Sequence, residues 1–238
     1  MSQLSLMGIT GIGEITPGAD LAAVIATAMA LEENPTLCDG DVVVVTQKVV
    51  SKAEGQLVAI DVEDSDAKVA LVEREAVRIL RRRGELRITE TVHGFICANA
   101  GVDLSNVDDG VAALLPVDAD RSARRIRAGL KQRTGTDVGV LISDTFGRPW
   151  RRGVTDVALG AAGIAAVIDL RGTPDANGRV LAATEVCVAD ELCGAAELVM
   201  GKDAGIPVAI IRGVDPSWLR PSSVREEIVR STAEDLFR

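Results

Sequence analysis

The chain has 238 residues, of which 47% are hydrophobic and 26% charged, and its formal net charge is −9. This length is enough for one large domain or two small ones with real cores, and the composition argues against a disordered chain. The acidic balance and the aromatic content of three Phe, two Trp and no Tyr argue against a nucleic-acid binder, because phosphate affinity needs basic residues and base stacking needs rings.

The N-terminal part of the chain predicts two strands and two helices. Residues 4–15 are apolar with three glycines and predict a strand that runs into a glycine-rich turn. Residues 20–31 predict a helix, because an acidic residue can cap it and apolar side chains recur on one face. The β-branched run 42–45 predicts a strand buried on both faces. Residues 67–83 predict an amphipathic helix that ends at Gly84.

The rest of the chain continues this mixture. The small apolar residues of 158–170 suit either a core element or a subunit interface. Since strands and helices do not alternate strictly, we expect an α+β fold with mixed β-sheets and flanking helices. Residues 1–215 would form the main domain, with room for two interleaved subdomains, and 216–238 a helical tail. The patterns predict strands at 88–91, 94–98, 138–142 and 208–211, helices at 120–133, 188–200 and 222–238, and a hairpin turn at 175–178.

The sequence gives no sign of disulfides, a zinc site or a membrane segment. None of the four cysteines stands in a C-x-x-C pair, so we expect free thiols in a reducing compartment. No apolar run approaches the length of about 18 residues that a membrane helix needs. The first residues lack the basic and apolar regions of a signal peptide. These features predict a cytoplasmic protein.

Familiar catalytic and nucleotide-binding motifs are missing. His93 is the single histidine and suits a structural role better than a catalytic one, which argues against Ser-His-Asp and Cys-His mechanisms. The sequence contains no G-x-x-x-x-G-K-[ST] motif, and Gly11-Ile12-Gly13 lacks the third glycine of a dinucleotide-binding turn. Lys48 and Lys52 follow a predicted buried strand, where a lysine can reach a phosphate or simply face solvent.

Two carboxylates follow apolar segments and are candidate ligands for a hard cation. Asp144 comes directly after the predicted strand 138–142, and Asp103 lies in a loop. Mg²⁺ and Mn²⁺ prefer oxygen donors and commonly take one or two protein carboxylates together with substrate phosphates. Thr145 adds a hydroxyl and Asn106 an amide beside these acids. The alternative is that both aspartates only shape or cap turns.

Basic residues close to Asp144 suggest an anion clamp. Arg148, Arg151 and Arg152 follow it within a few positions, and guanidinium groups bind phosphate and carboxylate oxygens in pairs. The same arginines could instead form simple ion pairs with nearby acids. Trp150, in the middle of this run, suits either a pocket wall or the core.

Taken in order, these segments resemble one family, the coenzyme F420-0:L-glutamate ligases, including the ligase half of the bifunctional actinobacterial enzyme. The resemblance spans residues 8–213. Each segment alone would be weak, but the ordered set is specific. The matching segments are GIGEI (11–15), DGDV (39–42), VVSKAEG (49–55), AGVDLSNV (100–107), LLP (114–116), SDTFGR (143–148), TEV (184–186), DE (190–191) and MGK (200–202).

The resemblance implies a fold and an activity. It implies an F420-0:gamma-glutamyl ligase-like fold, a ligase domain over residues 1–215 and a homodimer. It also implies that GTP drives the addition of L-glutamate to a deazaflavin, coenzyme F420-0 or its dehydro form, through an acyl phosphate in coenzyme F420 biosynthesis. Two divalent cations, Mg²⁺ or Mn²⁺, would take part, and a need for K⁺ is left open.

The resemblance further implies roles for individual residues. Asp103 and Asp144 would hold one metal ion and Thr145 would bind the second, with Asp103, Asp144 and Arg148 as the catalytic group. Gln47 stands where relatives often carry a serine, and Lys202 where some carry a metal-holding glutamine. The expected nucleotide contacts are Ile12, Gly13, Glu14, Ile15, Gln47, Lys52, Asn106, Gly201 and Lys202.

Two other functions stay open from the sequence. One is a nucleotide- or deazaflavin-binding module without turnover that serves a separate catalytic domain. The C-terminal tail motivates this alternative, because in the bifunctional relatives the ligase half runs into a nitroreductase-like flavin domain near there. The other is a different metal-dependent phosphoryl-transfer enzyme on the same scaffold.

Overall fold

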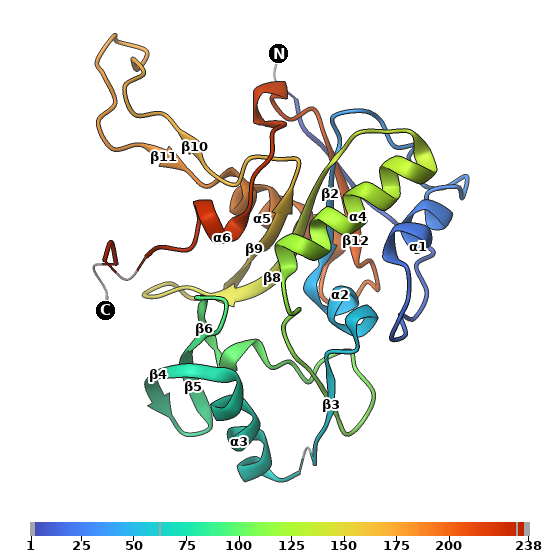
Figure 1. Ribbon diagram of the computed structural model, residues 1–238, viewed down its shortest axis with the longest axis vertical. Coiled ribbons are helices and arrows are strands. Elements are labelled where there is room, and N and C mark those ends of the chain that lie inside the picture. The colour runs from blue at the N-terminus through green and yellow to red at the C-terminus, as the bar shows by residue number, and fades with distance from the viewer. Residues whose placement is uncertain (1–2, 62, 232, 236–238) are drawn as a thin grey trace.

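The chain is built around a five-stranded mixed β-sheet (Figure 1). The computed structural model describes residues 3–61, 63–231 and 233–235. The strands lie in the order β1, β12, β2, β8, β9; β2 and β8 run parallel, and the other neighbouring pairs are antiparallel. Their bounds are Ser5–Gly8 for β1, Val42–Thr46 for β2, Gly139–Gly147 for β8, Val154–Ala162 for β9 and Val208–Arg212 for β12.

Helices cover both faces of this sheet. Val43 and Val45 share one apolar core with α1 (Leu21–Ala28), α2 (Gln47–Glu54) and α4 (Ala119–Thr134). Val42 and Val44 share the other core with α5 (Val188–Met200) and the short α6 (Val224–Glu227). Because successive strand residues point to opposite faces, the run 42–45 is buried on both sides, which confirms that prediction.

A small lobe, residues 57–113, is inserted between α2 and α4 and lies at the lower end of Figure 1. It has two small antiparallel sheets and its own apolar cluster around Leu71, Ala112 and Leu114. Its β6 contacts β8 of the main sheet. The elements are β3 Leu57–Ala59, α3 Ser65–Glu75, β4 Ala76–Arg83, β5 Leu86–Thr91, β6 Ile96–Ala98, the 3₁₀ helix η1 Asn99–Gly101 and β7 Val111–Ala113.

The predicted helix at 67–83 is wrong over its second half. The α3 helix ends at Glu75, and β4 pairs antiparallel with β5 from Ala76 onward. Long-range pairing overrides the helical periodicity here, and a cross-strand ion pair of 3.0 Å joins Arg78 to Glu90. Gly84, with a φ of +57°, is part of the turn between these two strands rather than a helix end.

The C-terminal segment is an irregular strap rather than the predicted helix at 222–238. Within the described residues it holds the 3₁₀ helix η2 (Pro216–Trp218) and the four residues of α6, and the remainder is not helical. Residues 232 and 236–238 of that prediction lie outside the described residues. Tertiary contacts fix the strap, because the Asp120 carboxylate accepts the Val224 N–H at 2.9 Å.

The other predicted elements are confirmed with shifted ends, and the α+β class with mixed sheets is correct. The stretch 158–170 supplies core through buried residues from Ala158 to Ala166. It then leads into a projecting two-stranded ribbon, β10 (Ile168–Asp169) and β11 (Glu185–Val186), with the expected turn at 175–178 (Figure 1). No helix among the described residues is long and apolar enough to cross a bilayer.

Candidate functional site

One edge of the main sheet gathers loops that are far apart in the sequence. β2 and β8 are parallel and paired from Val42↔Gly139 to Thr46↔Ser143, so their carboxyl ends meet at the same edge. β1 ends at this edge beside the beginning of β12, where Gly8 pairs with Ala209. The loops after β1, β2 and β8 and the loop before β12 therefore meet there.

Asp103 reaches this edge from the small lobe and is held by Lys48. The Lys48 ammonium lies 2.7 Å from a carboxylate oxygen of Asp103 and also donates to Ser105 Oγ at 2.7 Å. The Ser105 N–H donates to the same carboxylate at 2.7 Å. Burial alone would raise the pKa of Asp103, but these hydrogen bonds and the ammonium charge outweigh it, so the pKa is lowered. Lys48, expected to reach a phosphate or face solvent, instead fixes an acid.

Asp144 lies on β8, directly after the part of the strand that pairs with β2, and makes no ion pair with a basic side chain among the described residues. Burial, assisted by the nearby charges of Asp103 and Asp156, raises the pKa of Asp144 to about 7. The opposing hydrogen bond, from the Thr145 N–H at 2.8 Å, is too weak to cancel this effect. Within the described residues no Lys, Arg or His nitrogen lies in ion-pair contact with this carboxylate. It is therefore an uncompensated carboxylate beside a second one.

Asp156, on β9 opposite Thr145, is in the contrary situation. Its side chain is only 2% exposed and accepts hydrogen bonds from Ser143 Oγ at 2.9 Å and Thr145 Oγ1 at 2.5 Å. The Lys202 ammonium lies 3.1 Å from Asp156, 3.0 Å from a carboxylate oxygen of Glu197 and within hydrogen-bond distance of Thr145 Oγ1. Although burial favours the neutral amine, the two carboxylates raise the pKa of Lys202.

The structure thus brings Asp103, Asp144 and Thr145 to one edge, as the sequence predicted, but gives their oxygens different surroundings. Across the described ranges, no three His, Cys, Asp or Glu side chains converge to hold a metal ion on their own. A divalent cation at Asp103 and Asp144 would need further oxygens from water or a substrate, as Mg²⁺ sites usually do. Asp156 and Glu197 were not among the predicted residues. The missing signal for Asp156 was the pairing of β8 with β9 that places it opposite Thr145, and for Glu197 it was the contact with Lys202.

The residues predicted to contact a nucleotide lie around the same edge. Lys52 is buried and forms an ion pair with Glu14, which joins α2 to the loop after β1. Asn106 is exposed with a left-handed φ of +52°, and Gly201 ends α5 with a φ of +63°. The Gln47 amide is buried and donates to Ser51 Oγ at 2.6 Å and to the Leu114 carbonyl at 2.9 Å. Its nucleotide contact stays a prediction.

The predicted arginine clamp lies on the connection between β8 and β9, drawn in yellow beside β6 in Figure 1. Arg148, Arg151 and Arg152 are exposed, and in the described part of the chain none of them pairs with a carboxylate. Arg148 donates only a long hydrogen bond, 3.4 Å, to the Arg152 carbonyl. Trp150 is 92% exposed, so the alternative that it fills the core is wrong.

His93 has a structural setting. Its Nε2 lies 3.2 Å from the Val117 carbonyl, and its ring stacks on Phe95 with centroids 5.9 Å apart. Phe95 in turn meets Phe146, two residues after Asp144, edge to face at 6.3 Å. This aromatic chain links the small lobe to β8 and agrees with the structural role expected for the histidine. The four cysteines are free thiols, as predicted.

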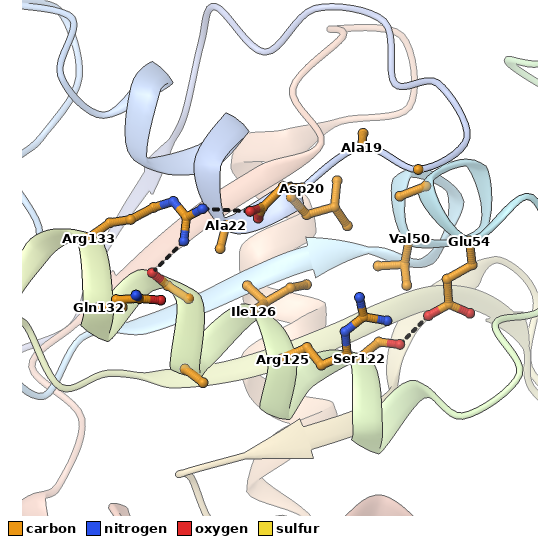
Figure 2. A pocket seen from close by; sticks show the side chains of 15 residues that line it. Ala19, Asp20, Ala22, Val50, Glu54, Ser122, Arg125, Ile126, Gln132 and Arg133 are labelled. Carbon is orange, nitrogen blue, oxygen red and sulfur yellow. Dashed lines mark hydrogen bonds and ion pairs between the residues drawn. The ribbon is translucent and has the colours of Figure 1, made fainter.

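A cavity also lies away from this edge of the sheet. It measures about 540 Å³, opens between α1, α2 and α4, and contains none of the predicted site residues. Figure 2 shows that its two carboxylates have partners: Asp20 pairs with Arg133 at one end, 2.6 Å apart, and Glu54 accepts a hydrogen bond from Ser122 at the other. Because these carboxylates already have partners, the acidic edge of the sheet is the better candidate for chemistry.

Comparison with known proteins yields one family. Residues 10–213 match the sequence profile of the family described as F420-0:gamma-glutamyl ligase. A protein named Coenzyme F420:L-glutamate ligase from Methanothermobacter thermautotrophicus is 41% identical, over 99% of this chain and 99% of its own length. Proteins with the same name from Methanopyrus kandleri and Methanocaldococcus jannaschii are 44% identical over 94% of both chains and 40% identical over 84% and 85%, respectively.

Proposed function

Because the chain belongs to the F420-0:gamma-glutamyl ligase family, we propose that it joins L-glutamate to the deazaflavin coenzyme F420-0, in coenzyme F420 biosynthesis, and that GTP drives the reaction. The observation that carries this proposal is the end-to-end likeness to enzymes named for that reaction, 41% identity over 99% of the chain. The acidic edge supports it, because it places two carboxylates where an anionic nucleotide and a cation could meet.

The proposed reaction has two steps. An oxygen of the deazaflavin side-chain carboxylate attacks the γ-phosphorus of GTP, the bond to the bridging oxygen breaks, and GDP leaves. The glutamate amine then attacks the acyl carbon of the resulting acyl phosphate, inorganic phosphate leaves, and the nitrogen loses a proton. Both steps bring anions together, so the site must supply positive charge and hold the reactants in line.

Asp103 and Asp144 fit a divalent cation at this site. Asp144 is a buried carboxylate whose own surroundings disfavour its charge, and Asp103 beside it is already ionised and oriented by Lys48. Mg²⁺ or Mn²⁺ bound there would offset the charge of the phosphate oxygens during transfer. Lys48 and Ser105 would fix the Asp103 carboxylate. The backbone of β8 would hold Asp144 in place.

The nucleotide is proposed to lie along the loop after β1 and the start of α2. The N-cap residue of α2, Thr46, makes no side-chain capping bond, so the first N–H groups of this helix are available to a phosphate. Lys52 and Glu14 would position the loop. Arg148 is exposed and pairs with no carboxylate of the described residues, and it would close over the substrate anions as the catalytic clamp.

The same likeness motivates the proposals that the enzyme is a homodimer and acts in the cytoplasm. The resemblance also implies a second divalent cation bound by Thr145. That expectation meets an obstacle, because the Thr145 hydroxyl already contacts the Lys202 ammonium and Asp156. A requirement for K⁺ is tested by replacing K⁺ with Na⁺ in the same assay.

The proposal is tested by incubating the protein with coenzyme F420-0, glutamate, GTP and Mn²⁺ and weighing the product by mass spectrometry. We expect the mass of F420-0 plus one or more glutamate residues, with GDP formed in step. Asp144→Asn should lower the rate at least about 100-fold, because it removes a charge that holds the cation. Asp175→Asn, in the distant turn of the projecting ribbon, is the matched control and should keep the wild-type rate.

The same assay separates the two alternatives. A binding module without turnover would release no phosphate from GTP when deazaflavin and glutamate are added. A different phosphoryl-transfer enzyme would consume GTP and form no amide. An Asp144→Asn rate near that of wild type would contradict the placement of the cation at Asp103 and Asp144, whatever the product.

A further inference from the structure

Lys202 occupies the position in which a second cation would have to bind. Its ammonium contacts an oxygen of each of three side chains: Thr145 Oγ1, Asp156 Oδ1 at 3.1 Å and Glu197 Oε1 at 3.0 Å. These hydroxyl and carboxylate oxygens are the donors that a hard divalent cation would require. A positively charged amine cannot ligate a metal, and it repels one.

The Lys202 ammonium gives the buried Asp156 carboxylate the positive charge that it needs. A buried carboxylate needs compensation by charge and hydrogen bonds. Asp156 is 2% exposed and receives both, from Lys202 and from the hydroxyls of Ser143 and Thr145. Asp144, one residue before Thr145 on the same strand, makes no ion pair with a basic side chain among the described residues. One acidic group is already neutralised and the other is not.

We propose that the Lys202 ammonium serves as a built-in cation at Thr145, Asp156 and Glu197, so that this enzyme binds a single divalent ion, at Asp103 and Asp144, in place of two. The proposal rests on the proposed function for the placement of that single ion. Lys202 follows α5 directly, and its neighbour Gly201 ends the helix with a left-handed φ of +63°. This turn places a residue of the loop before β12 next to the β8–β9 hairpin.

The proposal is tested by counting bound Mn²⁺ in the whole chain. Mn²⁺ is titrated into protein with one equivalent of GTP, without deazaflavin or glutamate, and free Mn²⁺ is followed by its electron paramagnetic resonance signal against a GTP blank. We expect one Mn²⁺ per wild-type chain with an uncoupled spectrum. Lys202→Gln should bind two, and the spectrum should show the magnetic coupling of two neighbouring ions.

Two further variants complete the test. Lys202→Arg keeps the positive charge and should keep one Mn²⁺. Lys131→Gln removes a lysine that is ion-paired with Asp137 at 2.8 Å on the surface, far from the site, and should also keep one. Two Mn²⁺ ions on the wild type, or one on Lys202→Gln, would overturn the proposal. No Mn²⁺ on the wild type would overturn both this proposal and the use of Asp103 and Asp144 as metal ligands, whereas an absent glutamylated product with one bound Mn²⁺ would contradict the proposed function alone.

Discussion

The two halves of the acidic edge carry the same kind of residue in opposite electrostatic states. On one side, Asp144 on β8 makes no ion pair within the described part of the chain, and it lies beside Asp103, which pairs with Lys48. On the other, Asp156 is fully buried but holds two hydroxyl donors and the Lys202 ammonium. In our proposal the first half binds a cation that comes with a substrate, whereas the second half carries a cationic side chain of the protein itself.

Charge compensation separates an acid with a structural role from an acid with a functional one. Asp144 and Asp156 lie in neighbouring pairs of the β8–β9 hairpin, so their position on the strands does not distinguish them. The compensation of their negative charge does distinguish them. A carboxylate whose charge the fold leaves uncompensated destabilises the protein unless a bound ligand supplies the missing charge.

The largest effect on stability is expected at the completed half. Asp156→Ala should lower the free energy of unfolding by about 3 kcal/mol, because Ser143 and Thr145 lose their acceptor inside the protein and the Lys202 pair is broken. Asp156→Asn keeps an acceptor oxygen and should lose about half as much. Urea unfolding of both variants measures this. If the two variants lost nothing, the second half would not be a stabilising network.

Asp144→Asn should do the opposite and stabilise the metal-free protein. The folded-state pKa of Asp144, about 7, is raised above the unfolded value of 3.8, so the carboxyl destabilises the fold increasingly as the pH rises from the unfolded value to about 7, and the penalty is constant above that. The gain from the asparagine should therefore grow by about 2 kcal/mol between pH 5 and pH 8. Urea unfolding in EDTA at both pH values measures it, and a gain independent of pH would contradict the assignment.

Asp103→Asn should weaken Mn²⁺ binding about 10-fold, close to 1.4 kcal/mol, because one charged ligand becomes a neutral amide. Lys202→Arg should change the same dissociation constant much less, since it keeps the charge of the completed half. Titration calorimetry with Mn²⁺ and GTP compares the two variants. Equal losses in both would show that the halves act as one site.

The smallest effect is expected at Trp150, in the turn between β8 and β9. Trp150→Ala should change the free energy of unfolding by less than about 0.5 kcal/mol, because the ring is 92% exposed. A loss above 1 kcal/mol in urea unfolding would mean that the ring is covered in solution, for instance by a second copy of the chain.

Much of the fold was predictable because its strands and most helices carry strong local patterns. The run 42–45 predicted a strand buried on both faces, and the pattern of 188–200 predicted a helix with Gly201 at its C-terminal cap. The structure has both. The failures came where distant contacts decide. Residues 76–83 have helical spacing but pair with β5, and the tail is fixed by Asp120 rather than by its own helix propensity.

The sequence predicted which residues gather at the candidate site, but it did not predict how their charges are compensated. The ordered motifs indicated Asp103, Asp144 and Thr145, and the structure places all three at one edge. Asp156 and Glu197 carry no motif of their own. Their importance comes from the register that sets Asp156 opposite Thr145 and from the helix turn that delivers Lys202. Lys202 reaches Thr145 and Asp156 from 57 and 46 positions away, and contacts between such distant residues leave no local signal in one sequence.

The most direct test of the central claim is the position of the metal in a crystal of the protein grown with GTP and Mn²⁺. An anomalous difference map locates Mn²⁺ without ambiguity. We expect one peak, in contact with Asp103 and Asp144. The Lys202 ammonium should still contact Thr145, Asp156 and Glu197. A second peak at the Thr145 hydroxyl, with Lys202 displaced from Asp156, would contradict it.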